Sequence, residues 1–514
     1  MNPSPSKRRL HTWTVVILFV ATLASRIPFR SQILYHWDSV NFAYAMSEFS
    51  VAKEQPQPPG YIVYVWLCRA VDRLFGDAQT TMVWISVVAS ALAVVALYYL
   101  GRAMFDARAG LVAALFLATS PLFWFYGEIA LPHSLDMLLV ILGVWWLYET
   151  MQGKRRYLFP AIAVMAVAGG VRQQTLVFLA PLILFALRKV GWQRFIVAGG
   201  LGGIICLAWF APLMALNGGA SGYFEAMGAF TDRFNATTSV LAGGGWWGVQ
   251  RNLIKLTLYT LFGWSVALLP FAAALITRAR KRDWPRQWEK VILFALWLLP
   301  TLVFYTVIHM GQQGLTFVFL PALLLWGARA LVRLFENGPR QRLATVTAAL
   351  LAVNIGIFCF APQYPLPTDR VRLLTRSALV ETDRYYADRF AAIEASLAPE
   401  STAILAANWH HVEYYLPRYT LLPMDVIAKW ELGEGQPTGR LRGVSVTPAD
   451  LGLQPDLDGR HTIVIFDPDL EPFNQSLSST HRLTLEHGAE MTFLVWTDGL
   501  VLNYGDRSFG LSEP

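Results

Sequence analysis

The chain has 514 residues, of which 55% are hydrophobic and only 15% are charged. This composition is too apolar for an ordinary soluble protein of that size and indicates a polytopic membrane protein. The three cysteines, Cys68, Cys206 and Cys359, lie far apart in the chain. Their spacing excludes a disulfide framework and a cysteine-based zinc site as organising features.

The net charge of +7 combines two regions of opposite sign. Residues 1–360 contain 30 basic and 14 acidic residues, whereas residues 361–514 contain 12 basic and 21 acidic residues. We therefore predict a membrane domain over 1–360, with an outward first loop over 30–79, and a separate soluble domain over 361–514. The positive excess does not indicate nucleic acid as a partner, because the basic residues follow the predicted membrane topology.

The fold class predicted for residues 1–360 is a mainly α, polytopic bundle of membrane helices. A helix needs about 20 apolar residues to cross the hydrocarbon core of a bilayer. The apolar runs of the chain predict about eleven such spans, at 12–29, 80–100, 110–126, 134–150, 157–171, 174–188, 194–215, 252–277, 289–308, 314–335 and 342–360.

The basic residues predict the orientation of this bundle. Eleven spans place 21 of the 30 basic residues on the same side as Lys7, Arg8 and Arg9. Because short cytoplasmic loops are rich in lysine and arginine, we expect the N-terminus in the cytoplasm and residues 361–514 outside it. The short loops favour a bacterial inner membrane over the endoplasmic reticulum.

Several segments outside the spans have a pattern of their own. Segment 61–76 is apolar but contains Arg69, Asp72 and Arg73 at helical spacing, which predicts an amphipathic helix on the outer surface. Segment 216–251 is glycine-rich and is predicted to be a long outward loop. In the tail, 401–409, 461–468 and 491–505 resemble strands and 383–398 has helical periodicity, which predicts an α/β domain.

The most informative polar stretch is "HWDSVNFAYAMSEFSVAKEQPQPPGY", which follows the first span. Asp38 lies among aromatic residues at the outer boundary, where a carboxylate could act as a general base towards a bound hydroxyl. The alternative is that Asp38 caps a helix. Lys53, Gln57 and Tyr61 belong to a proline-rich turn, which forms either a fixed binding surface or a rigid connector.

Other outward turns supply further candidates for binding residues. Glu128 and His133 stand with Asp136 in "FYGEIALPHSLD", where three ionisable groups share the rim of two spans. Arg172 lies between two spans and has a planar group that suits a phosphate; the alternative is that it merely reaches the interface. His309 and Gln312 belong to the turn "HMGQQG", whose polar side chains are further candidates for the rim of the binding site. The sequence leaves a divalent metal open, and no phosphate-binding loop occurs.

The order of these motifs resembles the GT-C membrane glycosyltransferases, the superfamily that includes aminoarabinose transferase and the protein O-mannosyltransferases. The resemblance lies in a first span followed by "HWDSVNFAYA", a proline turn that opens a surface helix, and "VVALYYLGRAMFDARAGLVAALFLATSPLFWFYGEIA". It covers residues 1–190 well, the remaining spans in layout, and the tail hardly at all.

The resemblance implies transfer of a sugar from a polyprenyl-phosphate donor to a lipid, glycan or protein acceptor at the outer face, usually with inversion. It implies that Asp38 is the base and that Arg172 helps to hold the phosphate of the carrier as it leaves. A transporter or flippase for a lipid-linked or anionic substrate is the alternative function. Transporters place charges near the middle of the bilayer and contain repeated halves, neither of which is evident in the sequence.

Overall fold

The structure is a computed structural model that describes residues 5–240, 243–281, 287–365, 372–423, 448–449, 451–468, 470, 480–496, 501–504 and 507–510. It contains two compact units. The membrane unit comprises residues 1–32 and 41–380, and the tail unit comprises residues 33–40 and 381–514. The tail unit thus includes eight residues from the first predicted outward loop.

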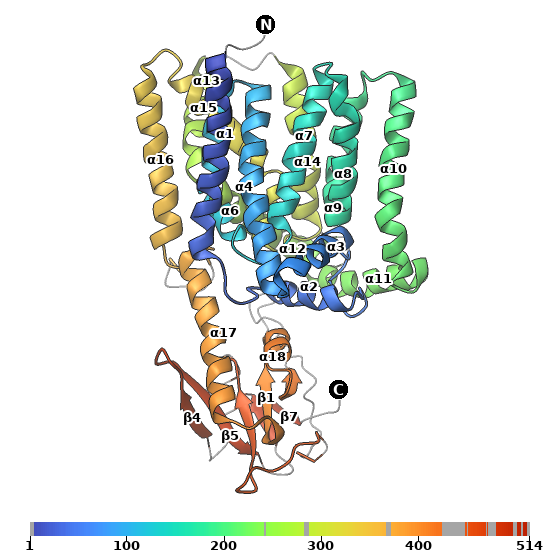
Figure 1. The fold of residues 1–514 in the computed structure, drawn as a ribbon, viewed down its shortest axis with the longest axis vertical. Coiled ribbons are helices and arrows are strands. Elements are labelled where there is room, and N and C mark those ends of the chain that lie inside the picture. Colours follow the sequence, from blue (N-terminus) through green and yellow to red (C-terminus); the bar gives the residue numbers. More distant parts are fainter. Residues whose placement is uncertain are drawn as a thin grey trace. The chain divides into compact units, whose positions relative to one another are not determined.

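Helices make up the membrane unit (Figure 1). The longer helices are α1 (Pro5–Arg26), α4 (Ala78–Met104), α7 (His133–Met151), α10 (Trp192–Ala215), α12 (Gly245–Trp264), α14 (Trp288–Val307) and α16 (Arg340–Phe360). The shorter ones are α5 (Ala107–Thr119), α6 (Pro121–Tyr126), α8 (Leu158–Val171), α9 (Gln173–Leu187), α13 (Leu268–Lys281) and α15 (Leu320–Leu334). Helix α4 is central and packs against α1, α5 and α7.

All eleven predicted spans coincide with helical segments, but three of them are broken. Segment 314–335 begins as a 3-10 helix over Gln313–Val318, and α15 starts only at Leu320. Segment 110–126 divides at Ser120, because Pro121 begins α6 and cannot donate a backbone hydrogen bond. Segment 252–277 divides at Ser265, whose φ of 47° is incompatible with a continuous helix. Within the described residues, seven segments are long and apolar enough to cross a membrane, so the count of eleven stays a prediction.

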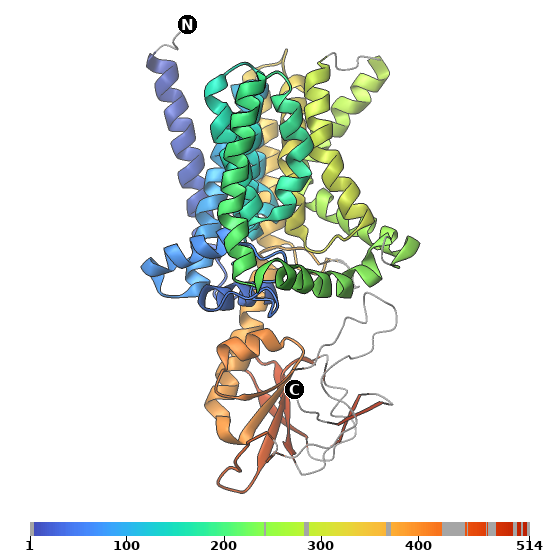
Figure 2. The ribbon, with the colours of Figure 1, turned by 90° about the vertical axis from the view of Figure 1, so that its right-hand side faces the viewer.

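Three helices lie at the end of the membrane unit opposite the N-terminus. They are α2 (Trp37–Ser47), α3 (Ile62–Phe75) and α11 (Gly219–Thr238). Helix α3 is the predicted surface helix, and Gly76 ends it in the left-handed conformation. Helix α11 runs across the bundle (Figure 2). The prediction of a loop over 216–251 was therefore wrong for residues 219–238, which form this helix, and for residues 245–251, which begin α12.

The tail unit is α/β, as its sequence pattern predicted. Its strands are β1 (Thr402–Ala406), β2 (Thr420–Pro423), β3 (His461–Ile465), β4 (Thr480–Thr484) and β5 (Glu490–Trp496), in the order β2-β1-β3-β5-β4. Strands β1, β2 and β3 are parallel, and β4 and β5 join them antiparallel. The segment predicted as one strand over 491–505 contains β5 and part of a separate pair, β6 (Val501–Tyr504) and β7 (Arg507–Gly510).

Both faces of the tail sheet are buried, which explains the continuous apolar run in its first strand. Ala403 and Leu405 pack on one side of the sheet, and Ile404 and Ala406 pack on the other. Helices α17 (Arg376–Ser396) and α18 (Trp409–Tyr415) cover the second side. Ile33 from the first outward loop also belongs to that core.

The crossing of α4 and α5 generates a testable prediction. A Cβ atom added to Gly110 would lie 2.5 Å from the Tyr98 carbonyl oxygen and 2.7 Å from the Arg102 nitrogen. Both are backbone atoms, so the helices must separate. We expect Gly110→Ala to destabilise the protein by about 1–3 kcal/mol, as overpacking does. Thermal unfolding in detergent measures the loss.

Gly199→Ala is the matched control for this substitution. Gly199 lies in α10, and nothing lies within 4 Å of a Cβ atom added there. Its unfolding temperature should match or slightly exceed that of the wild type, since alanine favours helix. Equal destabilisation by the two substitutions would contradict close contact between α4 and α5.

Candidate functional site

Asp38 lies in the first turn of α2, which begins at Trp37. The helix therefore starts before Asp38, and the residue that precedes it is His36. The His36 carbonyl accepts hydrogen bonds from the backbone of Ser39 and Val40. Asp38 is 9% exposed, and its Oδ2 lies 3.5 Å from Nδ1 of His36. A nearly buried carboxylate beside an imidazole is suited to proton transfer.

The tail unit holds the backbone that leads into Asp38. His411 Nε2 donates to the Leu34 carbonyl oxygen at 2.6 Å, and Tyr415 Oη accepts from the Leu34 nitrogen at 3.0 Å. Asp383 Oδ1 accepts from the Ile33 nitrogen at 3.3 Å. These three partners come from α17 and α18. Residues 33–40 therefore form an ordered part of the tail unit and not a free loop.

The other end of α2 is fixed within the membrane unit. Arg69 of α3 donates to the carbonyl oxygens of Ala45 and Met46 at 2.8 and 2.9 Å. These carbonyls belong to the last turn of α2, where a cation offsets the partial negative charge of the helix end. Arg69, which interrupts the apolar pattern of α3, therefore has a structural function.

The proline-rich turn is anchored through Pro59. Its carbonyl oxygen accepts from Gln173 Nε2 at 3.2 Å and from Tyr223 Oη at 3.1 Å. Gln57 is buried in the turn, and its Oε1 has no hydrogen-bond partner among the described residues. Tyr61 has a φ of 43° and its ring packs edge-on against Phe42. The turn is thus a fixed surface that adjoins the start of α9.

Lys53 lies apart from that surface. Its Nζ is 2.6 Å from Glu48 Oε1, and both side chains are about 60% exposed. An exposed pair of this kind contributes little to stability. The structure therefore separates Lys53 from the buried residues predicted to bind substrate, although it belongs to the same outward segment.

Arg172 forms the centre of a buried polar network. Its Nη2 donates to Tyr305 Oη at 2.7 Å, and its Nη1 lies 3.5 Å from Asp136 Oδ2. Thr175 Oγ1 donates to Asp136 at 2.8 Å. Arg172 and Asp136 are almost completely buried, yet Arg172 Nε has no hydrogen-bond partner among the described residues. The paired charges compensate for burial, and one donor stays available for a ligand.

His133 connects this network to the turn after α14. It lies three residues before Asp136, one turn earlier on α7, and its Nε2 is 3.0 Å from Gln312 Oε1. The His133 ring packs edge-on against Tyr126, and its Nδ1 has no partner among the described residues. His309 is in the same turn as Gln312. Four segments, at 57–61, 133–136, 172–175 and 305–312, therefore contribute to one polar region.

Glu128 belongs to a second buried group. Its Oε1 accepts from Trp124 Nε1 at 2.7 Å, and its carbonyl oxygen accepts from the Ser31 nitrogen at 2.9 Å. Arg26 lies over the Trp124 ring at 4.7 Å and is fully buried. Burial raises the pKa of Glu128 well above its usual value, and the charge of Arg26 opposes that rise. Glu128 thus connects the segment that follows α1 to the segment between α6 and α7.

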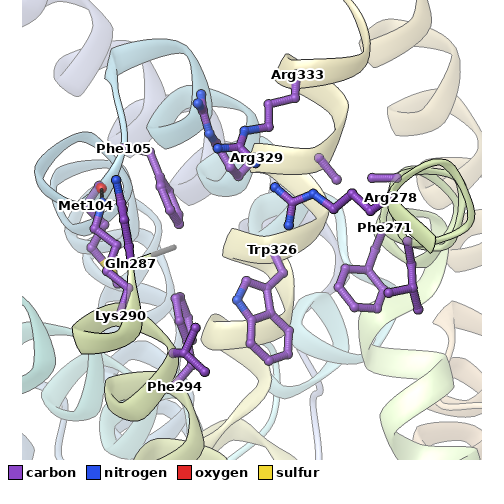
Figure 3. Close-up of a pocket in the computed structure, with 14 residues that line it drawn as sticks. Met104, Phe105, Phe271, Arg278, Gln287, Lys290, Phe294, Trp326, Arg329 and Arg333 are labelled. Atoms are coloured by element: carbon purple, nitrogen blue, oxygen red, sulfur yellow. Dashed lines mark hydrogen bonds between the residues drawn. The ribbon is translucent and has the colours of Figure 1, made fainter. Parts of the chain in front are cut away.

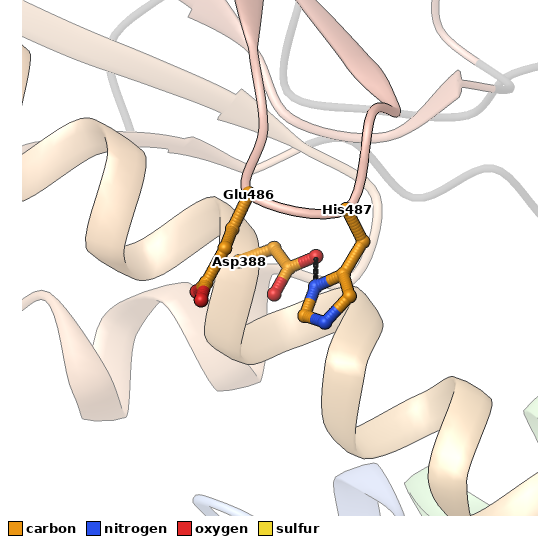
Figure 4. Close-up of side chains that lie close together, drawn as sticks. All are labelled: Asp388, Glu486 and His487. Carbon is orange, nitrogen blue, oxygen red and sulfur yellow. Dashed lines mark hydrogen bonds and ion pairs between the residues drawn. The ribbon is translucent and has the colours of Figure 1, made fainter.

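The sequence left open whether the protein binds a divalent metal. Among the described residues, one group of side chains has a geometry that could hold a metal ion, and this group lies in the tail unit. Ligand atoms of Asp388, Glu486 and His487 lie within 4.8 Å of one another (Figure 4). His487 Nδ1 is 2.8 Å from Asp388 Oδ2, and Glu486 and His487 are exposed. Within the described part of the chain, Glu486 has no contact to this pair beyond that proximity, and exposed groups of this kind are common in proteins.

Sequence reasoning missed several residues of the candidate site. Tyr305 and Arg26 lie in apolar helical segments, whereas Thr175 directly follows the polar residues 172–174 in the first turn of α9. Arg26 carried one usable signal, because a charge within a predicted span requires a partner. His411 and its partner Leu34 are separated by 377 residues, so no local pattern relates them.

Known proteins share this architecture. ArnT from Cupriavidus metallidurans bound to undecaprenyl phosphate has a TM-score of 0.54 and 13% identity, with 96% of this chain and 98% of that chain covered. The apo state of the same enzyme also has a TM-score of 0.54, with 15% identity and coverage of 95% and 98%. The chain therefore has the fold of ArnT, which confirms the fold that the resemblance implied.

In two further comparisons, a smaller part of one of the two proteins is matched. The oligosaccharyltransferase of Archaeoglobus fulgidus, in complex with Zn and sulfate, has a TM-score of 0.48 and 12% identity, with coverage of 90% of this chain and 68% of that chain. A family model described as dolichyl-phosphate-mannose-protein mannosyltransferase matches residues 56–215. This match spans the proline turn, Glu128, His133 and Arg172. No curated protein sequence matches the chain.

The burial of His411 predicts a pH dependence, because burial lowers its pKa although the hydrogen bond to Leu34 opposes that shift. Burial lowers the pKa of His411 from 6.5 to about 4. As the pH falls, the unfolded chain therefore binds the proton at a higher pH than the folded protein does. The stability that the neutral ring contributes to the fold is fully present above pH 6.5 and is lost as the pH falls towards 4. At the lower limit this loss is about 3 kcal/mol. Hydrogen exchange of residues 33–40, corrected for its intrinsic pH dependence, should show weaker protection at pH 5 than at pH 7.

His411→Gln is the control for this measurement, because the amide keeps an N–H donor and does not titrate in that range. Its protection of residues 33–40 should vary less with pH than that of the wild type. The same variation in both proteins would show that another group controls the opening of this segment.

Proposed function

We propose that the protein is a membrane glycosyltransferase that moves a sugar from a polyprenyl-phosphate donor to an acceptor at the extracytoplasmic face. The acceptor supplies a hydroxyl or amine and belongs to a lipid, a glycan or a protein. The GT-C fold and the family-model match support this function. ArnT, which has the same fold, is described with undecaprenyl phosphate bound, and this proposal extends that ligand class to the present chain.

The observation that carries the proposal is the buried network around Arg172. Four outward segments place an arginine, a histidine, an acid and amide groups in one region, and several of their polar atoms lack a partner among the described residues. Leaving such atoms unpaired costs about 1–3 kcal/mol each in a folded protein. A ligand with an anionic phosphate and sugar hydroxyls would supply those hydrogen bonds.

The proposed reaction is a single displacement. The Asp38 carboxylate accepts a proton from the acceptor group as the acceptor oxygen or nitrogen bonds to the anomeric carbon. The bond from that carbon to the phosphate oxygen breaks, and the polyprenyl phosphate leaves with the electron pair. Arg172 stabilises the charge that develops on the phosphate. Attack from the face opposite the leaving group inverts the anomeric configuration.

Transport of a lipid-linked or anionic substrate is the alternative, and the location of the buried charges favours transfer. Arg172 stands at the junction of α8 and α9, outside both helices. Asp136 lies in the first turn of α7. Charges at helix ends on one side of the membrane suit a reaction at that surface, whereas transporters concentrate substrate sites near the midplane.

Asp38→Asn provides the first test of this function. Purified protein in nanodiscs is incubated with a panel of radiolabelled polyprenyl-phosphate sugars, and both released and transferred sugar are measured. We expect wild-type turnover of at least one donor and a loss of about 100-fold or more in Asp38→Asn, because general-base catalysis typically contributes this much.

Glu225→Gln serves as the matched control, since Glu225 is an exposed acid on α11. It should retain wild-type turnover. Full activity of Asp38→Asn with an unchanged unfolding temperature would contradict the proposal that Asp38 is the general base. Movement of lipid-linked sugar across proteoliposomes without any transfer would establish the transporter.

The role of Arg172 is tested through inhibition by the polyprenyl phosphate product. The double variant Asp136→Asn with Arg172→Gln removes both charges and leaves no unpaired buried ion. We expect its inhibition constant to rise about tenfold, because a charge-assisted contact to phosphate is lost. Asp136→Asn alone keeps the cation and should bind the product at least as tightly as the wild type. If both variants bound the product equally weakly, the phosphate of the product would not be held by Arg172.

A further inference from the structure

The cavity of about 680 Å³ in the membrane unit lies away from the polar region around Arg172. It is bounded by α13, α14, α15 and the turn between α4 and α5 (Figure 3). Helix α15 begins near the turn that contains Gln312, and Arg329 and Arg333 in its last turns line the cavity. Fifteen helical residues rise about 22 Å, so the cavity and the candidate site lie at opposite ends of the membrane unit.

Four cations line this cavity: Arg278, Lys290, Arg329 and Arg333. Arg329 is paired with Asp106 at 2.8 Å, and Lys290 donates to the Met104 carbonyl oxygen at 2.7 Å. Arg278 and Arg333 have no hydrogen bond or ion pair within the described part of the chain. The described lining residues include no acid. The cavity therefore has an excess of positive charge that a bound anion would balance.

The same cavity has an aromatic and aliphatic side. Trp326 stacks on Phe271 with a centroid distance of 5.7 Å and contacts Phe294 at 4.9 Å. In the close-up, the side chains of Arg278 and Arg329 lie above Trp326 and Phe294. Leu275 and Val291 continue the apolar lining and are 47% and 36% exposed. The apolar part of the cavity is therefore accessible from outside the bundle, where hydrocarbon chains surround a membrane helix.

The positive-inside rule explains why basic residues occur at this end, but not why four of them surround a hollow. Arg155 and Arg156 satisfy that rule as exposed residues of a short turn, without any cavity. A free nucleotide is disfavoured because the sequence lacks a glycine-rich phosphate loop. The combination of cations and a laterally exposed apolar lining fits an amphiphile with an anionic head.

We propose that this cavity binds an anionic phospholipid of the adjoining leaflet, which the predicted topology makes the cytoplasmic one. Arg278 and Arg333 hold the phosphoryl head group, and its hydrocarbon chain lies along Leu275 and Val291. Juxtamembrane basic clusters attract anionic lipids in the same manner. The site is separate from the proposed transfer reaction and does not depend on it.

The test measures lipid binding to the full-length protein after delipidation in detergent. Short-chain phosphatidylglycerol, phosphatidylcholine and soluble glycerol phosphate are titrated separately, and bound species are counted by native mass spectrometry. We expect saturable binding of phosphatidylglycerol at one site and binding at least about tenfold weaker for the other two compounds. Equal binding of glycerol phosphate would overturn the lipid assignment, because the hydrocarbon chain would then contribute nothing.

Two variants locate the site. Arg278→Gln with Arg333→Gln removes the two unpaired cations and should weaken phosphatidylglycerol binding about tenfold. Ala274→Trp fills the apolar part while all four cations remain, and should weaken it by a similar factor. Arg155→Gln with Arg156→Gln is the control for surface charge and should bind like the wild type. The proposal fails if the control loses as much affinity as the first variant, or if Ala274→Trp binds normally.

Discussion

The low polarity of the membrane interior constrains every charged group in the bundle. An isolated charge there is expensive, so each one must reach an end of the bundle or acquire a partner. The Asp136–Arg172 pair meets this requirement with the hydroxyl groups of Thr175 and Tyr305. The residues around Arg172 are therefore fixed by their own electrostatic needs before any ligand arrives, which is the condition for preorganised recognition of charge.

A second set of hydrogen bonds holds the segments that follow the first helix. Arg69 holds the end of α2, and Gln173 holds the proline turn. The chain before Asp38 is bound by His411 and Tyr415 of the tail unit. The tail therefore has a function that its sequence did not reveal: it orders the segment that contains the proposed base. An acid on a free loop would lose much of its catalytic advantage, since productive geometry would be rare.

Periodicity and charge predicted the helical segments, the surface helix and the tail strands, because these depend on residues close in sequence. The polar partners were not predictable in that way. Ile33 and Asp383 are separated by 350 residues, and their hydrogen bond depends on how the tail folds. The break at Ser265 depends on a backbone angle that no local motif specifies. Sequence thus located the candidate residues, whereas the structure shows which of them lie together.

The two ends of α15 differ because they meet different demands. Near its beginning, Gln312 and His133 belong to a network in which the buried ion pair is internally balanced. Near its end, Arg329 has a partner while Arg333 has none among the described residues. Balanced charge suits a site that must bind and release a substrate during turnover. Unbalanced charge beside an aromatic cavity suits a ligand that stays bound, and an anionic lipid is the one such ligand that the membrane itself supplies in excess.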